Sequence, residues 1–285
     1  MTVKQKTRAI IQLLRIDLSF AAGISVVVGE IVAVGGFPSI YSIMLGFIVG
    51  FFISSSALIL NDYFDIEIDK INMPTRPLPS GIIKPSEVIL LSLINTIIGL
   101  IAAFFIGYIA LIVAIIFWII GFLYNWKFKR TGLPGNLMVS SSVAITFIFG
   151  GIAVGNPFNM IVWCFSLIAF FIDLGEEIAA DAMDMVGDQK INSKSIAISR
   201  GKDSALKIAG IMFGIVVFTS FIPVIFHWLG MVYLVMILFM DAIIVFSTFK
   251  LLNSQSIDEG RKYTRLIYLG ATVGLVAFIV GQILT

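Results

Sequence analysis

Long apolar runs separated by short polar segments fill the chain from residue 16 onward. Each run holds about 20 residues, the length that an α-helix needs to cross the hydrocarbon core of a bilayer. The apolar residues are continuous and do not alternate with polar ones, so a membrane β-barrel is not expected. The pattern predicts an all-α, polytopic membrane protein with nine transmembrane helices. These spans are expected at about residues 16–36, 39–60, 87–107, 109–126, 136–154, 157–180, 204–226, 229–250 and 263–284.

Basic residues fall on only one side of this predicted set of helices. All 19 Lys and Arg residues lie in the N-terminal arm, in the segments after the second, fourth, sixth and eighth runs, or at the run ends that border them. The tight connections on the other side, such as residues 35–38 and 155–157, have none. Because cytoplasmic loops carry the excess of Lys and Arg, we expect a multi-pass cell-membrane protein with its N-terminus in the cytoplasm and its C-terminus outside.

Composition supports the membrane class. Hydrophobic residues make up 59% of the 285 residues and charged residues only 13%, with a mean hydropathy of +1.05, whereas soluble domains carry about a quarter charged residues. The single cysteine, Cys164, excludes an intramolecular disulfide and a cysteine metal cluster. The basic N-terminus and the long first run lack a convincing signal cleavage site. We expect one transmembrane domain over residues 1–285 and no nucleic-acid partner.

The first candidate site is an acidic stretch at the end of the second apolar run, beginning at Asn61. In an unbroken helix at about 100° per residue, Asp62, Asp65 and Asp69 lie within about 100° of Asn61, on one face, while Glu67 points away. Ionised carboxylates beside a membrane are costly, so this face is a candidate functional site.

A second acidic stretch follows the sixth run and repeats this arrangement. With Glu177 set at 0° around the helix, all four nearby aspartates lie within about 40° of it: Asp173, Asp181, Asp184 and Asp188. In the predicted topology both stretches lie on the cytoplasmic side. The sequence therefore predicts that the two acidic faces meet across one site.

Stacked carboxylates repel one another unless a cation is present. Oxygen ligands with no His or Cys nearby favour a hard ion such as Mg²⁺, which binds a few carboxylates together with water and substrate phosphate. Two such clusters suit Mg²⁺ ions that clamp a diphosphate and neutralise it as a leaving group. The longest polar segments follow the two stretches, so we expect loops at about residues 61–86 and 181–203 to cap the site. The plainer alternative is that both stretches are solvated helix ends.

These residues resemble a known family, the UbiA superfamily of intramembrane prenyltransferases. The resemblance covers nearly the whole chain and implies nine helices in a bundle around a central cavity. Met73 stands where many members carry an arginine, which leaves Arg76 as the only arginine of that loop. The matching positions are Asn61, Asp62, Asp65 and Asp69 with Arg76 to Gly81 for the first signature, Asp181, Asp184 and Asp188 for the second, and Tyr124 with Lys127 for a tyrosine–lysine element.

The resemblance implies a Mg²⁺-dependent transfer of a polyprenyl group from its diphosphate to an acceptor. Residues 176–188 are most similar to the archaeal ether-lipid branch, which alkylates geranylgeranylglyceryl phosphate with geranylgeranyl diphosphate during phospholipid biosynthesis. The expected partners are therefore a polyprenyl diphosphate donor, a lipid phosphate acceptor and membrane lipids.

It also implies roles for individual residues. The expected metal ligands are Asn61, Asp62, Asp65, Asp69, Asp181, Asp184 and Asp188. The expected catalytic residues are Asp65, Asp69, Asp184, Asp188, Tyr124 and Lys127. The expected substrate-binding residues are Asn61, Arg76, Lys127, Lys129, Arg130, Lys190 and Lys194, with Arg200 and Lys202 also available to an anionic acceptor. Six of the basic residues fit equally well as topology anchors and lipid-headgroup contacts: Lys129, Arg130, Lys190, Lys194, Arg200 and Lys202.

Two rival functions remain open at this point. A prenyltransferase of the same family acting on an aromatic ring, as in quinone or haem and chlorophyll-related pathways, needs less basic surface. A cation-coupled transporter also uses intramembrane acids, but its site lies near the bilayer midplane in broken helices, whereas these clusters lie at one surface. Glu30 and Asp241 lie in the middle of spans, where an ionisable residue is either functional or a hydrogen-bonded packing residue.

Overall fold

The computed structural model describes residues 3–190 and 193–284, apart from the side chains of residues 3, 4, 72, 186–188 and 190. Within these ranges the regular structure is entirely helical. The elements are α1 (Val3–Leu14), α2 (Ile16–Val34), α3 (Ile40–Phe64), α4 (Ile66–Asn72), α5 (Pro85–Ile106), α6 (Tyr108–Leu123), the π-helix η1 (Tyr124–Phe128), α7 (Leu133–Ala153), α8 (Met160–Lys190), α9 (Ile196–Arg200), α10 (Lys202–Ser220), α11 (Ile222–Ile225), α12 (Met231–Leu252) and α13 (Ile257–Leu284).

The predicted membrane fold is confirmed. In the described part of the chain, eight helical segments are long and apolar enough to cross a bilayer: α2, α3, α5, α6 with η1, α7, α10 with α11, α12 and α13. The remaining long helix, α8, has 31 residues. Asp173 lies in its apolar first half, and Glu176 and Glu177 follow just past its middle, so these acidic residues make α8 less apolar than the other long helices. Eight spans plus α8 agree with the nine predicted helices.

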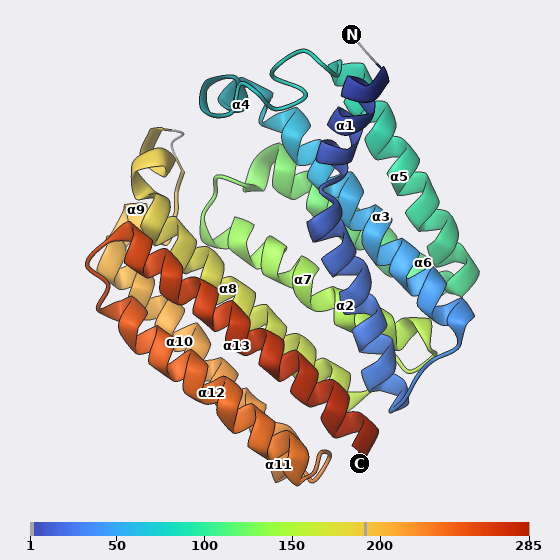
Figure 1. Cartoon of the computed structure of the whole chain (residues 1–285), viewed down its shortest axis with the longest axis vertical. Helices are drawn as coiled ribbons and strands as arrows, with labels where there is room; N and C mark the ends of the chain where they lie inside the picture. The colour runs from blue at the N-terminus through green and yellow to red at the C-terminus, as the bar shows by residue number, and fades with distance from the viewer. Residues whose placement is uncertain (1–2, 191–192, 285) are drawn as a thin grey trace.

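The long membrane helices from α2 onward run antiparallel to the next long helix in sequence, and the chain ends at the face opposite its start (Figure 1). The short helices α4 and α9, which belong to the two polar segments, lie at the same end of the molecule as the N-terminus. The closest packing joins α3 with α5, α2 with α3 and α7, α7 with α8, α8 with α10, and α12 with α13. This layout places the ends of α3 and α8, where the acidic stretches lie, at one face.

Backbones approach closely where α2 crosses α7. A Cβ atom at Gly29 would collide with the backbone oxygen of Phe147, and one at Gly150 would collide with the backbone of Val26 and Glu30. Small residues allow such contact in membranes, where helix association depends on packing because lipid is as apolar as the side chains. Glu30 is fully buried at this crossing, and neither of its carboxyl oxygens has a hydrogen-bond partner among the described residues.

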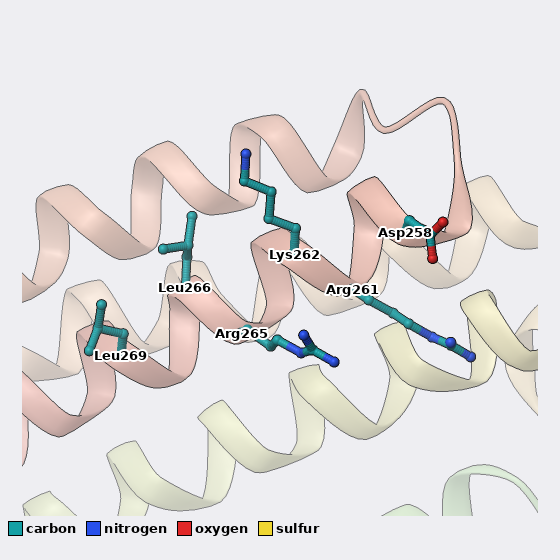
Figure 2. A pocket seen from close by; sticks show the side chains of 6 residues that line it. All are labelled: Asp258, Arg261, Lys262, Arg265, Leu266 and Leu269. Carbon is teal, nitrogen blue, oxygen red and sulfur yellow. The ribbon is translucent and has the colours of Figure 1, made fainter.

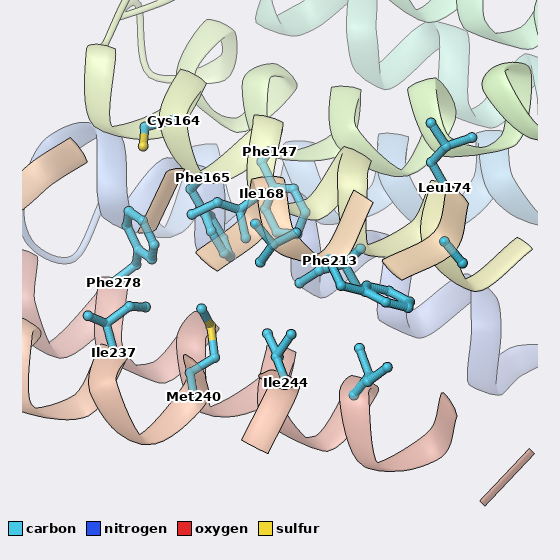
Figure 3. Close-up of a cluster of buried hydrophobic side chains, with 14 of the residues drawn as sticks. Phe147, Cys164, Phe165, Ile168, Leu174, Phe213, Ile237, Met240, Ile244 and Phe278 are labelled. Carbon is cyan, nitrogen blue, oxygen red and sulfur yellow. The ribbon is translucent and has the colours of Figure 1, made fainter. Parts of the chain in front are cut away.

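The largest apolar core lies between α7, α8, α10, α12 and α13 (Figure 3). Aromatic rings form its centre: the Phe165 ring lies 4.6 Å from Phe147 and 4.7 Å from Phe278, centroid to centroid. Cys164 is buried in this cluster, as expected of a packing residue. Asp241 lies beside the same core, where its Oδ2 accepts a hydrogen bond of 2.8 Å from the Ser220 hydroxyl. The core fixes α8 against its neighbours and so positions the second acidic stretch.

Candidate functional site

The first acidic stretch spans a break between two helices. The shared face expected for residues 61–69 assumes an unbroken helix, but α3 ends at Phe64 and α4 begins at Ile66. Asp65 lies between them at φ −89° and ψ 2°, a sparsely occupied backbone region in which many active-site residues are found. The i→i−4 hydrogen bonds continue across the break, since Asp65 N–H donates to Asn61 and Asp69 N–H donates to Asp65. The polar side chains therefore stay on one side, and Glu67 is exposed.

Two arginines neutralise the inner carboxylates of this stretch. Asp62 is 5% exposed, and its Oδ1 lies 2.6 Å from Arg15 Nη2 and 3.5 Å from Arg76 Nη1. Arg76 Nη1 also lies 2.7 Å from Asp69 Oδ2. Burial of the Arg76 guanidinium lowers its pKa, but the hydrogen bond to Asp69 and the charges of Asp69, Asp62 and Asp65 outweigh burial and hold the pKa above its usual value. Arg76 thus ties the polar loop to both helices.

Asn61 and Asp65 face η1. Asn125 donates through Nδ2 to the carbonyls of Ala57 and Gly121, at 2.9 and 3.0 Å. Its Oδ1 is therefore an acceptor, and it receives the amide of Asn61 at 2.8 Å. The Asn61 amide also lies 3.2 Å from Asp65 Oδ2 and 2.8 Å from Lys129 Nζ, and with its amide turned over Nδ2 donates to Asp65 while Oδ1 accepts from Lys129. Asn61 therefore joins the Asp65–Lys129 pair to η1.

The tyrosine–lysine element forms the π-helix η1. Its widened turn is closed by a 2.8 Å hydrogen bond from Lys129 N–H to the Tyr124 carbonyl, and π-helical turns are frequent at functional sites. Lys129 pairs with Asp65, while the Lys127 side chain is exposed. The element therefore turns Tyr124 and Lys129 toward the acidic residues and leaves Lys127 at the surface.

The second acidic stretch lies on α8, whose backbone is helical as far as Lys190. Asp173 accepts hydrogen bonds from Ser140 at 2.9 Å and from the Tyr268 hydroxyl at 3.4 Å. Asp181 Oδ2 accepts one from Asn136 at 3.0 Å. These partners come from α7 and α13, so the carboxylates of α8 are held from two sides.

Asp184 lies farther out on the same helix. Its Oδ1 is 2.6 Å from Arg261 Nη2 of α13, and both side chains are about half exposed. The side chains of Asp188 and Lys190 lie outside the described residues.

The two stretches meet around Tyr124. Asp65 from the first stretch and Glu177 and Asp181 from the second all interact electrostatically with its hydroxyl. Lys129, the partner of Asp65, also interacts with Glu177. Residues separated by more than 100 positions are thereby brought to one place.

The donor set fits Mg²⁺ by chemistry, because it consists of carboxylate and amide oxygens. Among the described residues, no group of three acidic, His or Cys side chains converges closely enough to hold a metal ion as the side chains stand. Arg15, Arg76 and Lys129 instead supply the positive charge beside the first stretch. The negative charges of the carboxylates at the break are therefore neutralised by basic side chains, and such side chains can also bind a phosphate group.

The second of the two predicted cap loops, at about residues 181–203, contacts the loop that follows η1. Lys194 N–H donates to the Arg130 carbonyl at 3.0 Å. Gly132 adopts φ 70° where a Cβ would collide with the Lys194 carbonyl, so a side chain is excluded here. The side chains of Arg130, Lys194 and Arg200 are exposed, and Lys202 is partly exposed.

Several residues of the site have no local signal in the sequence. Arg15, Asn125 and Asn136 each bond to one of the acidic motif residues or to Asn61, but only the folded arrangement shows this. Arg261 and Tyr268 reach α8 from α13, about 80 to 95 residues along the chain. Residue spacing in the sequence cannot reveal such partners, because it predicts contacts only between residues of the same helix.

Comparison with known proteins gives the family. A sequence model of the UbiA prenyltransferase family matches residues 22–280. Digeranylgeranylglyceryl phosphate synthase of Thermococcus kodakarensis is 33% identical over 276 residues, which cover 97% of this chain and 98% of the relative. A solved structure concerned with digeranylgeranylglyceryl phosphate synthase in membranes matches with a TM-score of 0.87 at 33% identity, covering 98% of this chain and 99% of that chain.

A more distant structure shares the fold. It is a UbiA homolog from Archaeoglobus fulgidus bound to DMAPP and Mg²⁺, with a TM-score of 0.68 at 19% identity, covering 94% of this chain and 98% of that chain. Because the family model spans residues 22–280 and the synthase relatives match over nearly their full length, this chain belongs to the UbiA prenyltransferase family, an all-helical family of membrane prenyltransferases.

Proposed function

We propose that this chain transfers the geranylgeranyl group of geranylgeranyl diphosphate to geranylgeranylglyceryl phosphate, with Mg²⁺, and so makes digeranylgeranylglyceryl phosphate for ether-lipid membranes. The observation that carries the proposal is the meeting of carboxylates from both motifs around Tyr124. The name and near-complete coverage of the 33% identical relatives support the choice of substrates. Membership of a transferase family also favours chemistry over ion-coupled transport.

The first motif would bind the diphosphate end of the donor. Arg76 already spans Asp62 and Asp69, and its planar guanidinium can turn one edge to diphosphate oxygens. Lys129 lies beside Asp65 and adds a second cation. The donor's apolar tail would lie between the membrane helices, where water is excluded from the allylic centre.

Seven side chains would share the bound Mg²⁺. These are Asn61, Asp62, Asp65 and Asp69 from the first motif and Asp181, Asp184 and Asp188 from the second. The oxygen-rich chemistry of this set, with the Asn61 and Asp65 side chains in contact at 3.2 Å, supports this role. When bound, Mg²⁺ would neutralise the diphosphate as it leaves.

The remaining predicted residues are proposed to act on the substrates. Tyr124 would hold the leaving diphosphate or the acceptor through its hydroxyl, since it lies between both motifs. Lys127, Arg130 and Lys194 would supply positive charge at the exposed rim. We propose a single domain over residues 1–285, in which the loops at about 61–86 and 181–203 cap this site; the 3.0 Å bond between Lys194 and Arg130 ties the second loop to the loop after η1 and supports a cap.

We further propose that the site and the N-terminus face the cytoplasm and the C-terminus lies outside. The basic residues lie at one end of the helices, as the positive-inside rule requires. The termini lie at opposite ends (Figure 1), which agrees with an odd number of spans.

The test is an assay of the detergent-solubilised protein with radiolabelled geranylgeranyl diphosphate and Mg²⁺. Geranylgeranylglyceryl phosphate and 4-hydroxybenzoate are offered in parallel, each with and without EDTA. We expect an EDTA-sensitive lipid product with the first acceptor only. Prenylated benzoate alone would place the protein in an aromatic-acceptor branch, and an unchanged donor with every acceptor would contradict the proposal altogether.

A further inference from the structure

An open pocket of about 520 Å³ lies along the first turns of α13 (Figure 2). Helix α13 begins at Ile257, six residues before the predicted span at 263, so this part of the helix extends beyond the predicted membrane segment. The pocket is lined by Asp258, Arg261, Lys262, Arg265, Leu266 and Leu269. None of these residues belongs to the sequence motifs of the proposed active site.

Positive charge dominates the lining. Three cations and one carboxylate give a net charge of +2, since 3 − 1 = 2. Arg261 and Arg265 are four residues apart on the helix, and Figure 2 shows both guanidinium groups extending to the same side, while Lys262 extends away from them. Arg261 pairs with Asp184, and among the carboxylates whose side chains the structure describes none forms an ion pair with Arg265. The arginine pair is therefore the natural anion-binding element of the pocket.

Toward the membrane end of the pocket two leucines line it, and Figure 2 shows them extending to the same side of α13 as Lys262. Leu266 and Leu269 line it one and two turns after Arg261, in the direction in which α13 continues as a membrane span. Both leucines keep part of their surface exposed. A ligand with an anionic head and an apolar chain would match both ends at once.

The pocket borders the second acidic motif. Arg261 reaches Asp184 at 2.6 Å. Farther along the same helix, the Tyr268 hydroxyl lies 3.4 Å from Asp173 and 3.5 Å from Glu176. A head group held by the arginine pair would therefore lie one side chain away from the carboxylates of α8.

We propose that this pocket binds the phosphate of the acceptor lipid, a single-chain glyceryl phosphate, through Arg261 and Arg265. The inference rests on the proposed function and adds the place of the acceptor. A phosphomonoester carries a charge of about −1.5 to −2 at pH 7, which balances the lining. Arginine pairs also suit phosphate because their planar forks bind two oxygens each.

Other observations favour this pocket over the basic residues near η1. Lys129 pairs with Asp65, beside the residues proposed to hold the donor diphosphate, so its charge is proposed to serve the donor and not the acceptor. A role as topology anchors requires only positive charge on the cytoplasmic side. It does not require two arginines on one helix face, one of them in contact with Asp184, in a pocket that leucines also line.

The test measures binding, so it does not depend on turnover. The wild type and the variants Arg265→Gln, Arg265→Lys and Lys250→Gln are placed in phosphatidylcholine nanodiscs. Each is titrated with 1-oleoylglycerol 3-phosphate, with 1-oleoylglycerol and with glycerol phosphate. Lys250 is the matched control, because it is a basic residue in the last turn of α12 that does not line the pocket.

We expect Arg265→Gln to weaken binding of the lipid phosphate roughly tenfold or more, as the loss of a hydrogen bond to a charged group predicts. Arg265→Lys should fall between this variant and the wild type, and Lys250→Gln should bind as the wild type does. Binding of 1-oleoylglycerol should be weak and unchanged in all variants. Unchanged affinity in Arg265→Gln, an equal loss in Lys250→Gln, or glycerol phosphate bound as tightly as the lipid would overturn the proposal.

The binding result can be separated from the activity assay. If the wild type forms lipid product but Arg265→Gln binds the lipid phosphate normally, the proposed function stands and the acceptor site is wrong. If the wild type forms no product yet shows Arg265-dependent binding, the pocket is a glyceryl phosphate lipid site and the proposed reaction is wrong.

Discussion

Replacing Asp62 with Asn tests whether the first acidic motif is held together by its ion pairs. Asp62 is 5% exposed and faces Arg15 at 2.6 Å and Arg76 at 3.5 Å. Breaking a fully buried pair costs about 3–5 kcal/mol. The two arginine side chains are 25% and 35% exposed, so they can partly turn to water, and we halve the cost to about 2 kcal/mol. Arg15 also has φ 41°, a left-handed backbone that the ion pair helps to hold.

For a chain of this size, a loss of about 2 kcal/mol lowers Tm by roughly 4–8 °C. The assay is thermal unfolding of the detergent-solubilised protein. The fraction of protein that remains monodisperse is measured after heating to each temperature, and Tm is its midpoint. Glu67→Gln is the matched control, because it removes a carboxylate of the same segment whose side chain is 77% exposed and pairs with Lys70, itself half exposed. We expect that variant to stay within about 2 °C of the wild type. A Tm for Asp62→Asn equal to that of Glu67→Gln would refute the reasoning.

Three further changes test other parts of the account. Asp65→Asn or Asp184→Asn should lower kcat by roughly 10²–10³-fold with little change in Tm, measured with saturating Mg²⁺ and donor; near-normal turnover in either would contradict the two-motif clamp. Removing divalent ions with EDTA should abolish product formation, and added Mg²⁺ should restore it; activity that persists in EDTA would exclude the proposed metal role. Gly29→Ala should destabilise by about 1–3 kcal/mol because its Cβ meets the Phe147 backbone, whereas Gly214→Ala, which meets nothing within 4 Å, should be neutral or stabilising; equal Tm values for the two variants would show that the α2–α7 contact is not tight.

The fold could be predicted in outline because the bilayer imposes it. Runs of about 20 apolar residues have few structural alternatives in lipid, where every backbone group must be hydrogen-bonded internally. The order of the helices followed from the runs, and α8 was found by its apolar first half in spite of Asp173 and Glu176. The break at Asp65 was missed, because the sequence around it continues the helical spacing and only the backbone angles reveal it.

The two acidic motifs were visible in the sequence, since carboxylates are rare in so apolar a chain. Their partners were not visible. Arg15, Asn125 and Arg261 act across helices, so their roles depend on packing angles that periodicity does not encode. Arg261, Lys262 and Arg265 at the start of α13 entered the sequence prediction only as charges that set the topology. The pocket that they line becomes apparent only in the folded chain, where α13 packs beside α8.

The central claim is that the two motifs together hold a metal-bound diphosphate. The most direct test is a crystal structure with Mn²⁺ and geranylgeranyl thiodiphosphate, in which anomalous scattering locates the metal ions. The account predicts metal peaks beside Asn61 and Asp65 and beside the carboxylates of α8, with the diphosphate between them and in contact with Arg76. A diphosphate held by basic residues alone, or metal peaks away from both motifs, would contradict it.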